Sequence, residues 1–160
     1  MYVDYMEAIR KRYENLGYQA YRWYVADKVA PWTQLKKNLN ECKLGLMSTS
    51  GAYALGQTAY HYKDDSSIRE IPSATPTADI RFSHITENYL VDPRKDPNCI
   101  FPTETLKSLV RKNVIGALAD SVFSCMGGTY SQRKVRDEIA PEILENFRRQ
   151  DIDCALLVAM

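Results

Sequence analysis

The sequence lacks several features that would point directly to a function class. No apolar run approaches the roughly 20 residues that a membrane-spanning helix requires, and the polar N-terminus has no apolar core of a signal peptide. Basic and acidic residues nearly balance, at 21 and 20. The resulting net charge of +1 gives no broad field for nucleic acid or anionic membrane. These absences predict a cytoplasmic protein that binds neither nucleic acid nor membrane.

Histidine and closely spaced cysteine are also scarce. The only two histidines are His61 and His84, and they form no cluster with further ligands, so we expect no metal and no other cofactor. The cysteines are widely separated and contain no CxxC pair, which predicts neither a zinc knuckle nor a disulfide framework. We expect four reduced thiols: Cys42, Cys99, Cys125 and Cys154.

What the sequence does contain is a pattern of strands and helices, most regular toward its end. An apolar run over 118–126 ends at Gly127-Gly128, as expected of a strand that enters a turn. From about Ser131 the apolar residues recur at helical spacing. The continuous apolar segment 152–160 then predicts a strand buried on both faces of a parallel sheet. This strand, helix and strand form a β-α-β unit.

The preceding residues predict the rest of an α/β domain. A strand beginning at Cys42 leads into the small-residue turn 48–51, and a helix begins at Thr103 after Pro102. Between them, 56–104 is rich in proline and predicts one strand near 79–83 within otherwise ordered coil. We therefore expect a three-layer α/β fold with a mainly parallel sheet, flanking helices and a long ordered loop region.

The N-terminal part has a different character. Apolar residues at four-residue steps over 4–16 predict an amphipathic helix closed by Gly17. The following segment, 18–32, is aromatic without a clear period and ends near Pro31. These features divide the chain into a helix and aromatic arm over 1–34 and an α/β domain over 35–160.

Candidate functional residues follow the predicted strands. Because parallel strands bring their carboxyl ends to one rim of a sheet, we expect five residues to face one crevice there: Ser48, Thr49, Arg69, His84 and Cys125. The turn at Ser48 and Thr49 could bind an anion through backbone N–H groups. His84 could shuttle a proton, and Cys125 is the best candidate for a reactive thiol. Arg69 could bind a substrate carboxylate through its planar guanidinium.

Each of these residues also has a structural interpretation. Ser48 and Thr49 fit a plain turn, and His84 fits a loop histidine whose ring is satisfied by backbone. Arg69 has Asp64, Asp65 and Glu70 nearby as partners for an ion pair. Cys99, next to Ile100 and Phe101, is more typical of a small packed residue than of a second redox thiol.

Five short motifs occur in a fixed order and together resemble one known group of enzymes. The chain is similar, from about residue 35 onward, to the selenoprotein B family of glycine, sarcosine, betaine and D-proline reductases. The motifs are Ser67-Ile68-Arg69-Glu70-Ile71-Pro72, Phe82-Ser83-His84, Asp92 with Asp96-Pro97-Asn98-Cys99-Ile100-Phe101-Pro102, Ile115-Gly116-Ala117-Leu118-Ala119 and Met126-Gly127-Gly128.

The resemblance implies a reaction and a missing residue. Such subunits reductively cleave a carbon–nitrogen bond of a small substrate with a chalcogen nucleophile, and a dithiol system takes up the oxidising equivalents. The family segment resembling 153–160 leads directly into a selenocysteine- or cysteine-containing motif. That nucleophile would follow Met160, so the α/β domain is incomplete relative to the family. A selenocysteine codon read as a stop, a cut chain and a short variant completed by another chain remain alternative explanations.

Two expectations about partners follow. The resemblance implies a small-molecule substrate and other reductase subunits. The apolar strands 118–126 and 152–160 need cover on both faces, which predicts an exposed apolar patch and self-association into a homo-oligomer. A non-catalytic interaction or scaffolding subunit is the alternative to an enzyme subunit.

Overall fold

The first of two compact units consists of one helix and an extended segment. The computed structural model describes residues 4–20 and 25–160, and the chain divides into Met1–Thr33 and Gln34–Met160. Helix α1, Tyr5–Asn15, begins where the Asp4 side chain accepts a hydrogen bond from the Glu7 N–H, and it ends before Gly17 at φ 81°. The predicted helix over 4–16 is confirmed. Tyr21, Trp23 and Tyr24 of the predicted aromatic arm lie outside the described residues.

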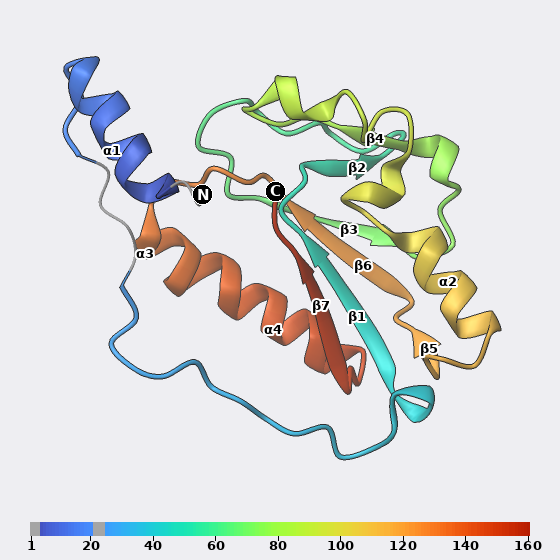
Figure 1. The fold of residues 1–160 in the computed structure, drawn as a ribbon. Coiled ribbons are helices and arrows are strands. Elements are labelled where there is room, and N and C mark those ends of the chain that lie inside the picture. The colour runs from blue at the N-terminus through green and yellow to red at the C-terminus, as the bar shows by residue number, and fades with distance from the viewer. Residues whose placement is uncertain (1–3, 21–24) are drawn as a thin grey trace. The chain divides into compact units, whose positions relative to one another are not determined.

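The second unit is built on a mainly parallel sheet whose central strand is β1, Lys43–Ser48. Strand β7, Cys154–Val158, lies along one edge of β1, and β5, Ala117–Leu118, and β6, Ser121–Cys125, follow each other along the other edge (Figure 1). All three pair with β1 in parallel. Strand β3, Ile68–Pro72, is added to β6 in antiparallel orientation.

Helices and a small ribbon cover the two faces of the sheet. On one face, α4, Ala140–Arg149, packs Phe147 edge-on against Phe123, with ring centroids 5.8 Å apart. Gly45 permits this approach, since a Cβ there would lie 2.9 Å from the Phe147 ring. On the other face lie α2, Thr103–Arg111, and the antiparallel pair of β2, Ala52–Ala54, with β4, Ile80–Phe82. The predicted three-layer α/β fold is confirmed.

Short helical turns complete the chain. Helix α4 continues from α3, Gln132–Lys134, through a π-helical turn, Val135–Ile139. Pro141 explains this turn, because proline has no N–H and its ring clashes with the carbonyl of a regular α-helix. The 3₁₀ turns are Leu39–Glu41, Thr77–Asp79, Glu87–Leu90 and Pro97–Cys99.

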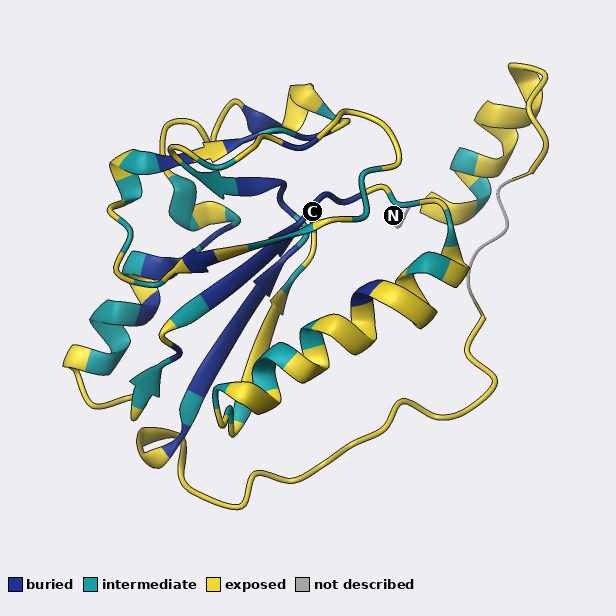
Figure 2. Cartoon of the chain, turned by 180° about the vertical axis from the view of Figure 1, so that it is seen from behind, coloured by how far each residue is buried: buried dark blue, intermediate teal, exposed yellow. Residues whose placement is uncertain are grey.

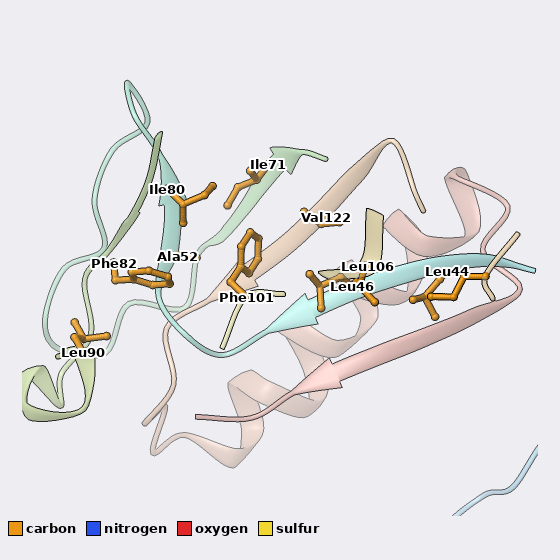
Figure 3. Packing of buried hydrophobic residues seen from close by; sticks show 11 residues of the cluster. Leu44, Leu46, Ala52, Ile71, Ile80, Phe82, Leu90, Phe101, Leu106 and Val122 are labelled. Atoms are coloured by element: carbon orange, nitrogen blue, oxygen red, sulfur yellow. The ribbon is translucent and has the colours of Figure 1, made fainter. Parts of the chain in front are cut away.

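The main hydrophobic core lies between the sheet and the layer that contains α2 and the β2–β4 ribbon. Figure 3 shows Phe101 within this core near Val122 of β6 and Leu46 of β1, and all three side chains are fully buried. A second cluster under α4 contains Met47, Phe123 and Cys125. No helix among the described residues is long and apolar enough to cross a membrane.

Three predictions about strands were wrong in part. The segment 152–160 forms an edge strand and is not buried on both faces: Leu157 is 70% exposed, because among the described residues β7 pairs only with β1 (Figure 2). In the proline-rich region, the predicted strand near 79–83 is confirmed as β4, but β3 lies where coil was expected. The predicted strand 118–126 is divided, since Ala119 and Asp120 separate β5 from β6.

Candidate functional site

Three segments meet where β1 and β6 end. The Gly127 N–H donates to the Thr49 carbonyl at 2.8 Å, and the Gly51 N–H donates to the Cys125 carbonyl at 2.9 Å. The Ser83 N–H, just after β4, donates to the Gly51 carbonyl at 3.0 Å. Gly51 has φ 66°, and a Cβ there would lie 2.1 Å from the Ser83 carbonyl oxygen, so no larger residue fits. These bonds fix the rim at the carboxyl ends of the strands.

His84 is buried at this rim, with only 4% of its surface exposed. Its Nδ1 accepts a hydrogen bond from the Thr86 N–H at 3.0 Å and lies 2.6 Å from the Thr86 hydroxyl oxygen. We therefore assign the ring proton of the neutral tautomer to Nε2. Nε2 is buried and has no hydrogen-bond partner among the described residues. Nε2 lies against the backbone of Gly127, since a Cβ on that residue would come within 2.6 Å of this nitrogen.

Burial lowers the pKa of His84, while Glu87 and the Thr49 carbonyl act in the opposite direction. The Thr49 carbonyl is close enough to affect the titration but does not meet the geometry of a hydrogen bond. His84 is consequently a neutral imidazole at pH 7. Its Nε2–H is a hydrogen-bond donor without an acceptor, which costs free energy unless a ligand or a movement of the rim supplies one.

Cys125 lies at the same rim on the face covered by α4. Only 5% of its surface is exposed, and burial raises the pKa of the thiol to about 11. At neutral pH the sulfur is therefore protonated and a weak nucleophile. A reactive thiol needs access to solvent and a lowered pKa, and buried Cys125 has neither.

An open groove of about 610 Å³ runs between the helical segment 135–147 and the strands β1, β6 and β7. Thr49 and Cys125 both line it, whereas His84 is separated from it by Gly127. The lining is almost entirely apolar and comes from the π-helical turn, α4 and the strand ends. Its residues are Met47, Thr49, Cys125, Met126, Gly127, Gly128, Thr129, Val135, Ile139, Ala140, Ile143, Leu144, Phe147, Ala155, Leu157, Val158, Ala159 and Met160.

The two predicted hydroxyl residues have structural partners. The Ser48 hydroxyl is fully buried, donates to the Ile100 carbonyl at 2.8 Å and accepts from the Ser50 N–H at 3.2 Å. It therefore holds the loop over the main core and does not line the groove. The Thr49 hydroxyl accepts from the Met160 N–H at 2.9 Å, which ties the residue after β7 to the end of β1.

Arg69 is not brought together with Cys125. Arg69, on β3, lies opposite Ser124 of β6. Its side chain therefore lies on the opposite face of the sheet from Cys125, the next residue of β6. The guanidinium donates to the Thr58 carbonyl at 2.8 Å and lies 4.2 Å from the centroid of the Tyr60 ring. This cation–π contact and the loop carbonyl hold Arg69 in a structural position. Arg69 forms no salt bridge with Asp64 or Asp65, so the predicted ion pair with these residues is absent.

Sequence reasoning missed two parts of the site. The π-helical turn supplies Val135 and Ile139 to the groove, and Pro141 inside a helical pattern was a signal for it. Gly127 was treated as a turn residue, although it also makes room for the His84 ring. Over the described residues, no group of three or more potential ligands could hold a metal ion.

Comparison with known proteins gives one informative similarity. The chain is 30% identical over 128 residues to the D-proline reductase subunit gamma of Acetoanaerobium sticklandii. The match covers 80% of this chain but 52% of that protein, so the chain spans about half the length of the relative. This supports a relation to reductases of the proline and glycine type. No protein-family model and no solved structure matches the chain.

Proposed function

We propose that this chain is a subunit, or part of a subunit, of a reductase complex that reductively cleaves a carbon–nitrogen bond of a small amino acid or betaine-like substrate. The similarity to a D-proline reductase subunit over 128 residues carries the proposal. Two of the five ordered motifs add support, because His84 and Gly127 within them lie together at one rim of the sheet.

The reaction requires two electrons and two protons. A dithiol supplies both and becomes a disulfide, while the carbon–nitrogen bond breaks and carbon and nitrogen each gain a hydrogen. A nucleophile that attacks the carbon must stand beside the substrate. The resemblance to the reductases would place this nucleophile close to Met160, whose carbonyl oxygen lies 3.0 Å from the Cβ position of Gly127 and thus near the His84 ring. Cys125 is the resident thiol at the same rim.

His84 has the clearest role in this site. Its Nε2–H would donate to the substrate carboxylate or to the anionic nucleophile after a small shift of the Gly127-Gly128 backbone. Because His84 is neutral, it donates without carrying a charge, and the low polarity around it strengthens the bond. Thr49 positions the segment at Met160 through its hydroxyl, and the apolar groove would accept the hydrocarbon part of the substrate.

The test is a chimera in which this chain replaces the matched segment of the Acetoanaerobium sticklandii subunit, assembled with that enzyme's other subunits. We expect dithiol-dependent turnover of glycine, sarcosine, betaine or proline, and none from the 160-residue chain alone. His84→Gln should abolish turnover without unfolding the chimera, whereas Leu55→Ala, at a site 64% exposed, should not change it. Full activity of His84→Gln would contradict the role of His84.

A non-catalytic interaction subunit is the second candidate. The exposed residues of β7 favour this candidate. The name of the relative, which describes one subunit of a reductase, favours it as well. A folded chimera that assembles with the other subunits but turns over none of the four substrates would support this candidate and contradict the enzymatic one.

A further inference from the structure

A second cavity, separate from the groove, is lined by positively charged side chains. Its volume is about 410 Å³, and its walls come from the β2–β4 ribbon, the turn before β4 and the segment 93–97. Arg81, Arg94 and Lys95 all line it, and the described residues of its wall include no carboxylate. Pockets for small molecules commonly have volumes of about 300–1,000 Å³. We call this cavity the basic pocket, and all of its lining residues lie between Tyr53 and Pro97.

Arg81 gives the basic pocket a charge in a fixed position. Its Nη1 donates to the Ala78 carbonyl at 2.6 Å and to the Ile80 carbonyl at 2.9 Å, which holds the guanidinium in place. No carboxylate of the described residues forms a salt bridge with Arg81. A guanidinium has five N–H donors, so Nε and Nη2 remain available to a ligand. Because the side chain is already held, binding would order it at little further cost.

Arg94 and Lys95 add two charges from the segment 93–97. Arg94 pairs with Glu87, and the Lys95 ammonium lies 3.0 Å from an Asp92 carboxylate oxygen. All four side chains are more than half exposed, and ion pairs of such exposure contribute little free energy. Both cations also have N–H donors beyond those used in the pairs. A strongly charged ligand can therefore compete for them.

Thr77 adds a polar group that lacks a partner. It lines the basic pocket, and its buried hydroxyl has no hydrogen-bond partner among the described residues. A buried hydroxyl without a partner costs free energy, which an acceptor in the pocket would recover. Three cations and one free hydroxyl at a single cavity favour an anionic ligand that has several acceptor oxygens.

We propose that the basic pocket binds the phosphate group of a small phosphate monoester. This group carries a charge of about −1.5 to −2 at pH 7 and has three acceptor oxygens, which suits three cations from two segments. A carboxylate has one charge and two oxygens in one plane, so it matches the cations less well. Phe82, Pro93 and Pro97 line the rest of the cavity and would contact the organic part of the ligand. The proposal does not depend on the reductase activity.

Calorimetric titration of the chain with glycerol phosphate tests whether the site exists. We expect saturable binding of one molecule per chain, with competition by inorganic phosphate, because the phosphate group is the part that the cations recognise. Succinate carries a similar charge on two separate carboxylates and should bind about tenfold more weakly, the loss expected for one hydrogen bond to a charged group. Binding of inorganic phosphate without binding of glycerol phosphate would contradict a monoester site.

Three variants locate the binding. Arg81→Met removes the fixed cation and should weaken glycerol phosphate binding by about tenfold or more. Lys95→Met should also weaken it, and this change lies at an exposed side chain where it does not threaten the fold. Arg148→Met is the matched control, because Arg148 is exposed on α4 and does not line the pocket, and it should bind as the wild-type chain does.

Three results would overturn the proposal. They are the absence of saturable binding to the wild-type chain, equal affinity for succinate and glycerol phosphate, and equal losses of affinity in Lys95→Met and Arg148→Met. Circular dichroism of each variant shows whether it is folded, so that a loss of binding is not mistaken for a loss of structure. If Arg81→Met is unfolded, the comparison of Lys95→Met with Arg148→Met decides the question.

Discussion

The two edges of the sheet differ in how they meet their surroundings. Strand β3 carries Arg69, Glu70 and Pro72, and Glu70 also pairs with Arg149 of α4 at 3.1 Å. Strand β7, at the other edge, is uncharged and exposes Leu157. Charges and proline are the usual means of preventing further pairing. The comparison predicts that further pairing is disfavoured at the edge of β3 and favoured at the edge of β7.

The largest expected loss of stability comes from a cavity in the core beneath the sheet. Phe123→Ala deletes a fully buried ring that packs against Phe147. The free energy of unfolding should fall by about 3–5 kcal/mol. Denaturant titration followed by circular dichroism measures this loss. Leu157→Ala, on the exposed strand, should change the same quantity by less than about 1 kcal/mol, and equal losses would contradict the burial difference.

A smaller loss of stability is expected from a change on the face of the sheet that α4 covers. Gly45→Ala places a Cβ 2.9 Å from the Phe147 ring, so α4 must move from β1 and β7. We expect a loss of about 1–3 kcal/mol in the free energy of unfolding. The double variant Gly45→Ala, Phe147→Leu should be less destabilised than the sum of its single changes. Simple additivity would show that the two residues do not interact.

The contrast between the edges can be removed by changing β3. Glu70→Val with Pro72→Val leaves β3 with fewer barriers to pairing. We expect concentration-dependent association, seen by light scattering as species larger than those of the wild-type chain. Adding Leu157→Asp should leave this new association in place, because it involves the opposite edge. If the β3 variant behaves as the wild-type chain does, the residues at β3 are not what closes that edge.

The smallest effect concerns pH and the rim at the carboxyl ends. Because burial lowers the pKa of His84, the folded protein favours the neutral ring. This contribution is complete above the ordinary histidine pKa of about 6.5 and is lost as pH falls through the lower pKa of the folded state. The free energy of unfolding should decrease over that range. His84→Gln should flatten the profile, and an unchanged profile would contradict the burial of a neutral ring.

The sequence predicted the elements with strong periodicity. The helix from about 131 lies where the apolar spacing placed it. The helix at Thr103, expected after Pro102, and β1, expected before the small-residue turn, are also found where they were predicted. Strand β3 was missed because Arg69, Glu70 and Pro72 resemble a loop, although they are the residues that suit an edge. The apolarity of 152–160 predicted a covered strand, and apolarity alone cannot tell a buried strand from an edge that awaits a partner.

The candidate site was predictable only in part. The carboxyl-end rule correctly predicted that Thr49 and Cys125 line one groove, since parallel strands align their ends. It could not show that Gly127 lies between His84 and the groove, or that Cys125 is shielded. Arg69 was misplaced because β3 runs antiparallel, and the residue's face depends on a register that no local pattern encodes.

Hydrogen–deuterium exchange at single-residue resolution tests most directly whether the sheet is closed at β3 and open at β7. The Val158 carbonyl accepts from the Thr49 N–H, so Ala155 and Leu157 direct their backbone groups away from β1. If another chain pairs with this edge, the amides of Ala155 and Leu157 should exchange more slowly at high protein concentration and faster on dilution. The amides of β3 should be unaffected by concentration. Concentration-independent exchange at Ala155 and Leu157, or protection that appears at β3 instead, would contradict the difference between the two edges.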